Sequence, residues 1–313
     1  MHYIVTGGAG FIGSHLSETL ARRGDAVTIL DNLSSGKYEN IKNLLPENDL
    51  SFVKGDILDF DLLSESFRNA DGVFHHAALV SVPRSIQYPV DYHEVNVTGT
   101  LNVLLAARHC GLKKVVIASS AAVYGNSPGL PKREDMPPTP LSPYAVTKVM
   151  DEYYARIFTD IYGLETACLR YFNIYGPRQD PSSDYAAVVP KFITNLLQGH
   201  VPVIFGDGEQ TRDLIFVKDV VQANIDVMES NATGIFNIAN GREISVNTLA
   251  RQLMQIFDVP GVPRYEKTRE GDVYKSCADI TKARTVFGFE PAWSLEAGMR
   301  ETVDWFAAHA GPV

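Results

Sequence analysis

Residues 7–13 read Gly-Gly-Ala-Gly-Phe-Ile-Gly and follow the short apolar run His2–Thr6. The stretch after them, Ser14–Arg23, has leucines one helical turn apart, so the segment predicts a strand, a tight turn and a helix. The first of its spaced glycines permits the turn, the second lets backbone approach a pyrophosphate, and the third lets the helix sit close to the sheet. These are Gly7, Gly10 and Gly13.

The same alternation continues through the first half of the chain. Further strands are expected at 26–30, 50–53, 72–75, 114–119 and 166–171, and helices at 62–69, 91–109 and 144–161. Strands alternating with helices predict an α/β fold, a doubly wound parallel sheet of the Rossmann type with helices on both faces.

The rhythm changes after about Asn173, where prolines, glycines and short apolar pieces become frequent. Strands are expected at 202–205 and 214–217, and helices at 189–198 and 247–257. We therefore expect a Rossmann domain over residues 1–172 and a smaller, irregular α/β substrate domain over 173–313. The second covers the carboxyl ends of the sheet, and some of its segments return to the first domain.

Composition excludes several classes of protein. The 313 residues carry a formal net charge of −9, which argues against nucleic acid or an anionic membrane as partner, because both need a basic face. Three widely spaced cysteines, Cys110, Cys168 and Cys277, predict buried thiols in a reducing compartment and no zinc or other metal site. With no apolar run of membrane length and no leader pattern, we expect a cytoplasmic protein.

A carboxylate closes the second predicted strand. Asp31 stands where it can accept hydrogen bonds from an adenosine ribose, and residues 32–36 contain no arginine that would bind a 2′-phosphate. The pattern therefore favours NAD over NADP. Asp56, after the third strand, is placed to meet the adenine edge, although it can equally be a turn residue. Small residues follow the fourth strand at 76–79, where the cofactor would lie against backbone.

A second group of residues carries chemistry. Tyr144 and Lys148 are four positions apart on one helix and share a face. An ammonium beside a phenol favours the phenolate, which can take a proton from a sugar hydroxyl while hydride leaves the same carbon. Such a pair is common on exposed helices, but Ser119-Ser120 ends a strand at the carboxyl edge of the sheet, where a hydroxyl can hold the same substrate oxygen. The glycines, the serine and the Tyr–Lys pair together predict an active site.

Several longer strings resemble the extended short-chain dehydrogenase/reductase family, and within it the NAD-dependent sugar-nucleotide epimerases. The similarity runs from Met1 to about Trp293, and the segments 81–85 and 178–190 are most similar to the UDP-N-acetylglucosamine 4-epimerases of the family. The strings are VTGGAGFIGSHL (5–16), DNLSSG (31–36), NVTGTLNVL (96–104), SSAAVYG (119–125), SPYAVTK (142–148), LRYFNIYGPRQ (169–179) and TRDLIFVKD (211–219).

The resemblance implies a role for each matching residue. Its catalytic residues would be Ser120, Tyr144 and Lys148. With the motifs above, the expected NAD contacts are Gly7, Gly10, Phe11, Ile12, Gly13, Asp31, Asn32, Ser34, Ser35, Gly36, Asp56, Ile57, His76, Ala77, Ala78, Asn96, Ser119, Tyr144, Lys148 and Phe172. The expected UDP-sugar contacts are Ser81, Ser120, Tyr144, Asn173, Val188, Val203, Phe205, Arg212, Arg269, Asp272 and Ser276.

The residues after the strand-end serine select among the reactions of the family. Family members that eliminate water carry an Asp-Glu pair there, because elimination needs an acid and a base. Ala121 and Ala122 can be neither, and the glutamate typical of UDP-glucuronate decarboxylases is also absent. A UDP-hexose 4-epimerase with bound NAD remains. Another NAD-dependent nucleotide-sugar oxidoreductase, decarboxylase or dehydratase on this scaffold is the alternative, and a non-catalytic NAD-binding protein is a second.

Three residues bear on the substrate. Arg212 and Arg269 match diphosphate-binding arginines of the family, and a guanidinium suits that ligand, although Arg212 beside Asp213 can also be a surface ion pair. Ser276 matches a position that is tyrosine in some glucose-restricted members, so serine would leave room for a 2-acetamido group. Acetamido-sugar relatives carry hydroxyl residues at 121–122, which weakens that inference. We expect UDP-glucose and UDP-galactose, and also their N-acetylated counterparts, as substrates.

The helices at 91–109 and 144–161 each carry apolar residues beyond those that one sheet needs. In the family these helices form a four-helix bundle between two subunits, so the resemblance implies a homodimer. The alternative is that loops of the same chain cover the second apolar stripe.

Overall fold

The centre of the molecule is a parallel sheet of seven strands in the part of the chain that the computed structural model describes, residues 1–45, 49–181, 188–268 and 274–309. The strand order is β10-β6-β5-β4-β1-β2-β3. All neighbouring strands are parallel, which confirms the doubly wound fold. The strands are β1 (His2–Thr6), β2 (Ala26–Asp31), β3 (Leu50–Lys54), β4 (Gly72–His75), β5 (Lys114–Ser120), β6 (Glu165–Tyr171) and β10 (Gly234–Ile238).

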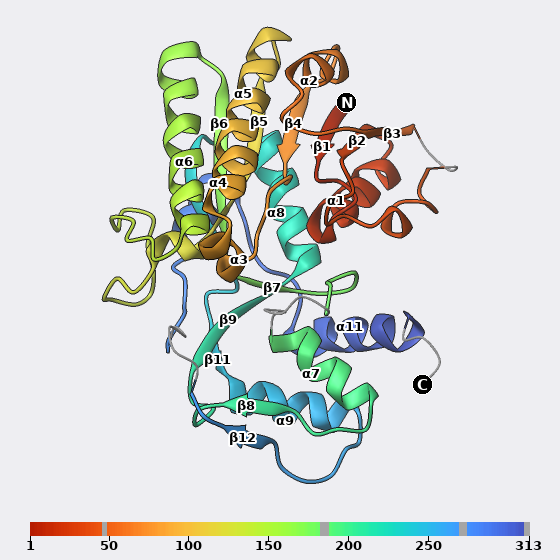
Figure 1. Cartoon of the computed structure of the whole chain (residues 1–313), viewed down its shortest axis with the longest axis vertical. Helices are drawn as coiled ribbons and strands as arrows, with labels where there is room; N and C mark the ends of the chain where they lie inside the picture. Colours follow the sequence, from red (N-terminus) through yellow and green to blue (C-terminus); the bar gives the residue numbers. More distant parts are fainter. Residues whose placement is uncertain (46–48, 182–187, 269–273, 310–313) are drawn as a thin grey trace.

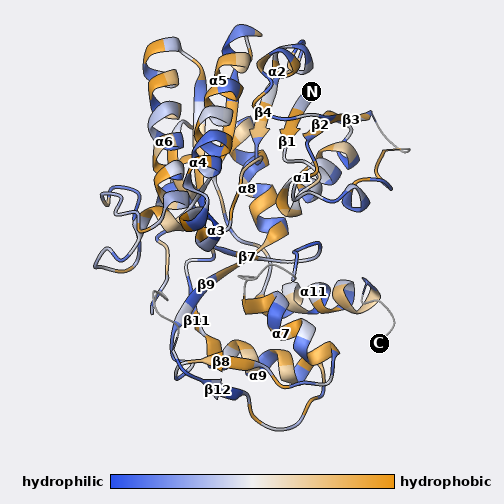
Figure 2. Cartoon of the chain, in the orientation of Figure 1, coloured by the Kyte–Doolittle hydropathy of each residue, from blue (hydrophilic) through white to orange (hydrophobic). Residues whose placement is uncertain are grey.

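Helices cover both faces of this sheet (Figure 1). On one face α1 (Phe11–Arg22) and α8 (Val217–Glu229) share a buried apolar cluster with the strands. On the other face lie α2 (Phe60–Ser66), α5 (Gly99–His109) and α6 (Pro143–Tyr162). Because both faces are covered, the inner strands are apolar along most of their length, as Figure 2 shows for β1 and β4.

Local sequence fixes both ends of α6, the longest helix. Ser142 caps its first turn by accepting a hydrogen bond from the Ala145 N–H at 3.2 Å, and Pro143 occupies the first helical position. Gly163 ends the helix in the left-handed conformation, with φ of +72°, which an L side chain adopts only with strain. The helix therefore begins at the carboxyl edge of the sheet, next to the end of β5.

A smaller unit lies beyond the carboxyl ends of the strands (Figure 1). It has its own apolar core, to which Phe192, Ile204 and Leu253 contribute. Its strands are β7 (Asn173–Tyr175), β8 (Val203–Phe205), β9 (Thr211–Phe216), β11 (Glu243–Ser245) and β12 (Arg264–Glu266), and its helices are α7 (Val188–Leu197), α9 (Val246–Ile256) and α11 (Leu295–His309).

Short helical segments complete the described chain. In the first half of the chain these are the 3-10 turns Tyr38–Asn40 and Ala121–Tyr124, α3 (Val82–Gln87), α4 (Pro89–Tyr92) and the π-helical segment His93–Thr98. Near the end of the chain, α10 (Thr281–Phe287) precedes α11. Within the described ranges, no helix has both the length and the apolar run that a membrane span needs.

The structure refines the expected boundary at residue 172. Strand β10, helix α8 and helix α10 follow that residue in the chain, yet β10 completes the large sheet and the two helices pack against its strands. The expected strand at 214–217 was placed too late, because β9 spans Thr211–Phe216 and Val217 already begins α8. The three cysteines are free thiols, but only Cys168 is buried, since Cys110 and Cys277 are half-buried.

Asp213 connects β9 to the segments around it. The residue is fully buried, and its carboxylate accepts hydrogen bonds from the N–H groups of Asn240, Gly241 and Ala278 at 2.8, 3.1 and 3.0 Å. Burial raises its pKa to about 6, although these N–H groups oppose the shift. One interpretation of the sequence placed Asp213 in a surface ion pair with Arg212, and the burial of Asp213 argues against it. The Asp213 carboxylate instead fixes the position of β9, the strand that carries Arg212.

Candidate active site

A cleft of about 540 Å³ opens at the carboxyl edge of the sheet. The segments that follow β1, β2, β3, β4 and β6 line it, together with the end of β5 and the first turns of α1 and α6. Nearly all the expected cofactor residues form its walls, as do the three expected catalytic residues. The expected residues that line it are Gly7, Gly10, Phe11, Ile12, Gly13, Asp31, Asn32, Ser34, Ser35, Gly36, Asp56, Ile57, His76, Ala77, Ala78, Ser119, Ser120, Tyr144, Lys148 and Phe172.

The turn after β1 needs glycine because backbone segments approach each other closely there. A Cβ atom on Gly13 would lie 2.3 Å from the Gly7 carbonyl oxygen, and one on Gly7, whose φ is +68°, would lie 2.6 Å from the Ala77 nitrogen. A side chain at Gly13 would therefore push α1 away from the turn after β1, and one at Gly7 would push that turn away from the loop after β4. Gly10 is the N-cap of α1 and offers no side chain to its first amide groups, so these amides are available to a phosphate.

Asp31 lies at the end of β2 inside the cleft. Its two carboxylate oxygens accept hydrogen bonds from the Ala9 N–H at 3.0 Å and the Leu33 N–H at 2.8 Å. Burial raises the pKa of Asp31 and these two bonds oppose the shift. A carboxylate has about four acceptor positions, so two remain for ribose hydroxyls. Gly36 closes over the group, because a Cβ there would come within 2.8 Å of both oxygens.

Asn32 and Asp56 form one wall together. The Asn32 side-chain amide donates to Asp56 Oδ2 at 2.8 Å, while Asp56 Oδ1 accepts from the Leu58 N–H at 3.0 Å. Asp56 is therefore a turn residue, as one interpretation of the sequence had it, and it also lines the cleft in which the adenine contact was expected.

Asn96 is not on the cleft wall but behind it. Its side chain is fully buried in the π-helical segment, accepts from the Leu79 N–H at 2.8 Å and donates to the Leu79 carbonyl oxygen at 3.0 Å. It also donates to Thr147 Oγ1 at 3.0 Å. Asn96 therefore attaches the loop after β4, which does line the cleft, to helix α6. In this structure it supports the cofactor loop indirectly.

The three expected catalytic residues converge on the cleft from two elements. Ser120 ends β5, where its Oγ accepts from the Ala122 N–H at 3.1 Å. Tyr144 and Lys148 lie one turn apart on α6 and both line the same cleft, with only 9% and 3% of their surfaces exposed. A phenol, an ammonium and a hydroxyl thus lie in one largely buried site. These are the groups required to move a proton to or from a hydroxyl group.

Ser119 lines the cleft, but its side chain is engaged elsewhere. Its Oγ donates to Glu152 Oε1 at 2.6 Å, and Glu152 in turn accepts two hydrogen bonds from the Arg170 guanidinium at 2.8 and 2.7 Å. The whole group is buried. Of the two strand-end serines, Ser120 is therefore the one whose hydroxyl is not committed to this buried ion pair.

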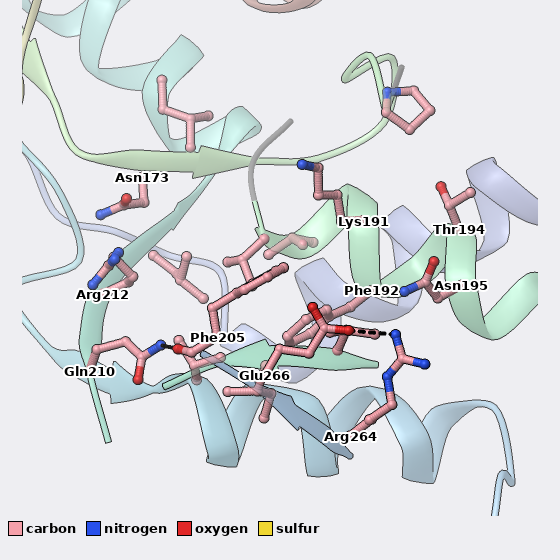
Figure 3. A pocket seen from close by; sticks show the side chains of 18 residues that line it. Asn173, Lys191, Phe192, Thr194, Asn195, Phe205, Gln210, Arg212, Arg264 and Glu266 are labelled. Atoms are coloured by element: carbon pink, nitrogen blue, oxygen red, sulfur yellow. Dashed lines mark hydrogen bonds and ion pairs between the residues drawn. The ribbon is translucent and has the colours of Figure 1, made fainter. Parts of the chain in front are cut away.

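A second cavity, of about 590 Å³, lies in the smaller unit between α7, β8 and β12. The expected substrate residues Asn173, Val188, Val203, Phe205 and Arg212 line it. Figure 3 shows Asn173 and Arg212 together at one end, with Phe205 in the middle. Asn173 and Ile174 also line the first cleft, so strand β7 forms a wall common to both.

Two expected substrate residues that the structure describes are not on these walls. The Ser81 hydroxyl accepts from the Arg84 N–H at 3.4 Å and caps α3. Ser276 is half-buried but does not belong to the described lining of either cavity. Arg269 and Asp272 lie outside the described residues.

The structure adds wall residues that sequence reasoning missed. Gln179 lines the first cleft, where its side-chain amide donates to the Ile174 carbonyl oxygen at 3.0 Å. In the second cavity, α7 presents polar residues at helical spacing, and β12 brings an Arg264–Glu266 ion pair at 2.6 Å. The i, i+4 spacing along α7 was the available signal, because it places Lys191 and Asn195 on one face. The missed polar residues of this cavity are Lys191, Thr194, Asn195, Gln210, Arg264 and Glu266.

Comparison with known proteins agrees with this geometry. The model of the NAD dependent epimerase/dehydratase family matches residues 3–239. The chain belongs to this family. It is 42% identical over 310 residues to a UDP-glucose 4-epimerase of Mycolicibacterium smegmatis, covering 98% of each sequence.

Solved structures of the family superpose closely on the chain. A UDP-N-acetylglucosamine 4-epimerase from Methanobrevibacter ruminantium M1, in complex with UDP-N-acetylmuramic acid, has a TM-score of 0.95 at 43% identity and covers 99% of both chains. A UDP-glucose 4-epimerase from Thermotoga maritima, with UDP-glucose, has a TM-score of 0.93 at 40% identity, covering 98% of this chain and 99% of that one.

The cofactor of the family, NAD, fits the first cleft. The close glycine contacts leave backbone amides toward a diphosphate, and Asp31 keeps acceptor positions for a ribose. A carboxylate at that position would also repel the 2′-phosphate of NADP. Within the described ranges, no cluster of three or more His, Cys, Asp or Glu residues is arranged to hold a metal ion.

We expect Asp31→Asn to weaken NAD binding about tenfold or more, because it removes the charge from hydrogen bonds worth about 1.5–3 kcal/mol. The preference for NAD over NADP should shrink as well, since the repulsion of the 2′-phosphate is lost. Calorimetric titration with both dinucleotides measures these changes. Asp59→Asn is the matched control, because Asp59 caps α2 outside the cleft; equal effects of the two variants would contradict the assignment.

Proposed function

We propose that the chain is a UDP-hexose 4-epimerase that interconverts UDP-glucose and UDP-galactose, and also UDP-N-acetylglucosamine and UDP-N-acetylgalactosamine. The observation that carries the proposal is the shared wall of the two cavities. A nucleotide bound in the second cavity can extend its sugar past Asn173 into the first cleft, toward Ser120 and Tyr144. The kinship with sugar-nucleotide 4-epimerases supports the same substrate class.

The chemistry follows from the three cleft residues. As a phenolate, Tyr144 removes the proton of the sugar 4-hydroxyl, and Ser120 holds that oxygen by a hydrogen bond. The Lys148 ammonium favours the phenolate by its charge. NAD, held by the residues of the first cleft, would supply the hydride acceptor for carbon 4 and the hydride donor for the return step, in which the Tyr144 hydroxyl gives the proton back to the 4-oxygen. The 4-keto sugar must turn over between the two transfers, so that its other face receives the hydride.

This cycle needs a tightly held nucleotide and a loosely held sugar. We assign the nucleotide to the second cavity, where Phe205 would flank the uracil and Arg212 the diphosphate. The Arg212 side chain already donates to the Thr211 carbonyl oxygen at 2.8 Å, and the buried Asp213 fixes its strand. Arg269 and Asp272 are proposed as further nucleotide contacts from the resemblance alone.

Dehydration, one of the alternative reactions, lacks the acid and the base that it needs. Ala121 and Ala122 begin the 3-10 turn directly after Ser120, and an alanine can neither donate a proton to a leaving hydroxyl nor remove one from carbon 5. Dehydration is therefore disfavoured. A net dehydrogenase that exchanges its cofactor remains the second candidate, and the dependence of activity on added NAD distinguishes it.

We further propose a homodimer through α6. The outer face of this helix exposes an apolar stripe at helical spacing, formed by Val146, Tyr153, Ile157 and Ile161. The large apolar residues of α5, in contrast, are not exposed, so α5 supports a four-helix bundle less than its sequence suggested. A monomeric mass in sedimentation equilibrium would refute the dimer.

We also propose a cytoplasmic location. The three free thiols support it, and cell fractionation tests it.

Replacing Tyr144 by phenylalanine removes the proton acceptor and retains the ring. We expect the interconversion of UDP-glucose and UDP-galactose, assayed without added NAD, to slow by about two to four orders of magnitude. NAD retention and thermal unfolding should stay close to those of the unaltered protein, which would show that the fold is intact. An unchanged rate in this variant would eliminate the proposed mechanism, and a strict need for added NAD in the unaltered protein would favour the net dehydrogenase.

Substrate size provides a separate prediction. If residue 276 limits the space beside carbon 2 of the sugar, Ser276→Tyr should abolish turnover of the N-acetylated pair and spare the plain pair. Product ratios from all four UDP-sugars measure this selectivity, and Ser276→Ala is the control that leaves the space open. Equal losses for both pairs would show that residue 276 does not act as a gate.

A further inference from the structure

Asp151 lies one helical turn beyond Lys148 on α6 and points at it. The distance from Lys148 Nζ to Asp151 Oδ2 is 3.1 Å, and the two side chains are 4% and 0% exposed. The ammonium has three N–H donors; one is used on Asp151, and two remain for groups in the cleft that Lys148 lines.

A carboxylate this deeply buried needs compensation. Its second oxygen, Oδ1, has no hydrogen-bond partner in the described part of the chain, so the ion pair with Lys148 is the main interaction that offsets its desolvation. Buried ion pairs often stabilise a fold less than apolar residues of similar volume. The position of this pair at the base of the cleft therefore points to a role in the reaction more than in stability.

Buried polar residues lie between Asp151 and the glycine turn after β1. Thr100 of α5 stands beside the carboxylate, and its Oγ1 lies 2.9 Å from His75 Nε2. His75 Nδ1 lies in turn 2.7 Å from Thr6 Oγ1, at the end of β1 just before Gly7. All these side chains are buried, so buried polar residues lie between the Lys148–Asp151 pair and the glycine turn after β1.

No other charged group competes for Lys148 from the elements packed against it in the described structure. His75, at the end of β4, and His76, directly after it, are neutral, because burial lowers both pKa values, that of His76 to about 4. From β6, burial raises the pKa of Cys168 and keeps it a thiol. On α6 itself Glu152 is paired with Arg170, which leaves Tyr144 and Asp151 facing the ammonium.

We propose that Asp151 is a positioning residue for the reaction proposed above: it anchors the Lys148 ammonium and directs its free N–H groups toward Tyr144. The inference rests on that proposed function. Burial alone would lower the pKa of Lys148, but attraction to Asp151 and Tyr144 outweighs it, so this pKa lies above its ordinary value of 10.5. The lysine therefore stays charged throughout the pH range in which the phenolate is needed.

The first test is Asp151→Asn, which keeps the shape and an acceptor oxygen but removes the charge. Without the carboxylate, burial dominates and Lys148 loses its proton at lower pH. We expect kcat to fall with little change in KM, and the alkaline limb of the kcat profile to move down by about one pH unit or more. A residue that only supported the fold would reduce the amount of folded enzyme and leave the limb in place.

The second test does not depend on turnover. The ¹³Cε resonance of Lys148 in lysine-labelled protein, assigned with Lys148→Arg, reports the protonation of this one ammonium. In the unaltered protein it should remain in its charged form up to at least the ordinary lysine value, and in Asp151→Asn its midpoint should move down with the kinetic limb. If the protein proved not to epimerise UDP-sugars, this titration would still decide the role of Asp151.

Asp219→Asn is the matched control, because Asp219 is a buried carboxylate on α8 that accepts from the Ala292 N–H at 2.8 Å, outside the lining of the cleft. It should lower thermal stability and leave both pH midpoints unchanged. Superimposable pH profiles for Asp151→Asn and the unaltered protein would overturn the proposal. If Asp151→Asn failed to fold, a Lys148 midpoint below 10.5 in the unaltered protein would overturn it as well.

Discussion

The architecture depends on the close approach of bare backbone at the carboxyl edge of the parallel sheet. Gly13 on α1 comes so near the Gly7 carbonyl that no side chain fits between them, and Gly7 is equally close to the loop after β4. This contact places the first turn of α1, Asp31 and the loop at 76–80 around one cleft. Since parallel strands all end at the same edge, β5 and α6 deliver their reactive side chains to the same place.

A second constraint is electrostatic. The cleft and its base hold charges that water would otherwise solvate, so each needs a partner: Asp31 has backbone N–H groups, Glu152 has Arg170, and Lys148 has Asp151. The smaller unit repeats the device with Asp213, whose buried carboxylate organises three segments around Arg212. In the proposed function, the nucleotide and the reacting sugar occupy two different cavities, and within the described residues these cavities share the wall at β7.

Much of this could be predicted from sequence, because the signals were local. The glycine spacing, the carboxylate after the second strand and the Tyr–Lys pair are each patterns that can be recognised within a few residues along the chain. The sequence indicated that some later segments return to the first domain, but not which of them. Contacts between distant segments decide this and two further features: β10 joins the sheet from residue 234, Asn96 binds Leu79 behind the cleft wall, and the Ser119 hydroxyl bonds Glu152. Asp213 beside Arg212 was ambiguous for the same reason, because its partners lie 27 to 65 positions away.

The central claim is that a hydride leaves carbon 4 of a nucleotide sugar and returns to it within one closed site. The most direct measurement uses UDP-glucose labelled with deuterium at carbon 4 and purified protein without added NAD. The account predicts that UDP-galactose forms with the deuterium still on carbon 4, and that a large excess of unlabelled NADH in solution does not dilute it. Loss of the label to water, or its exchange with the added dinucleotide, would contradict the account.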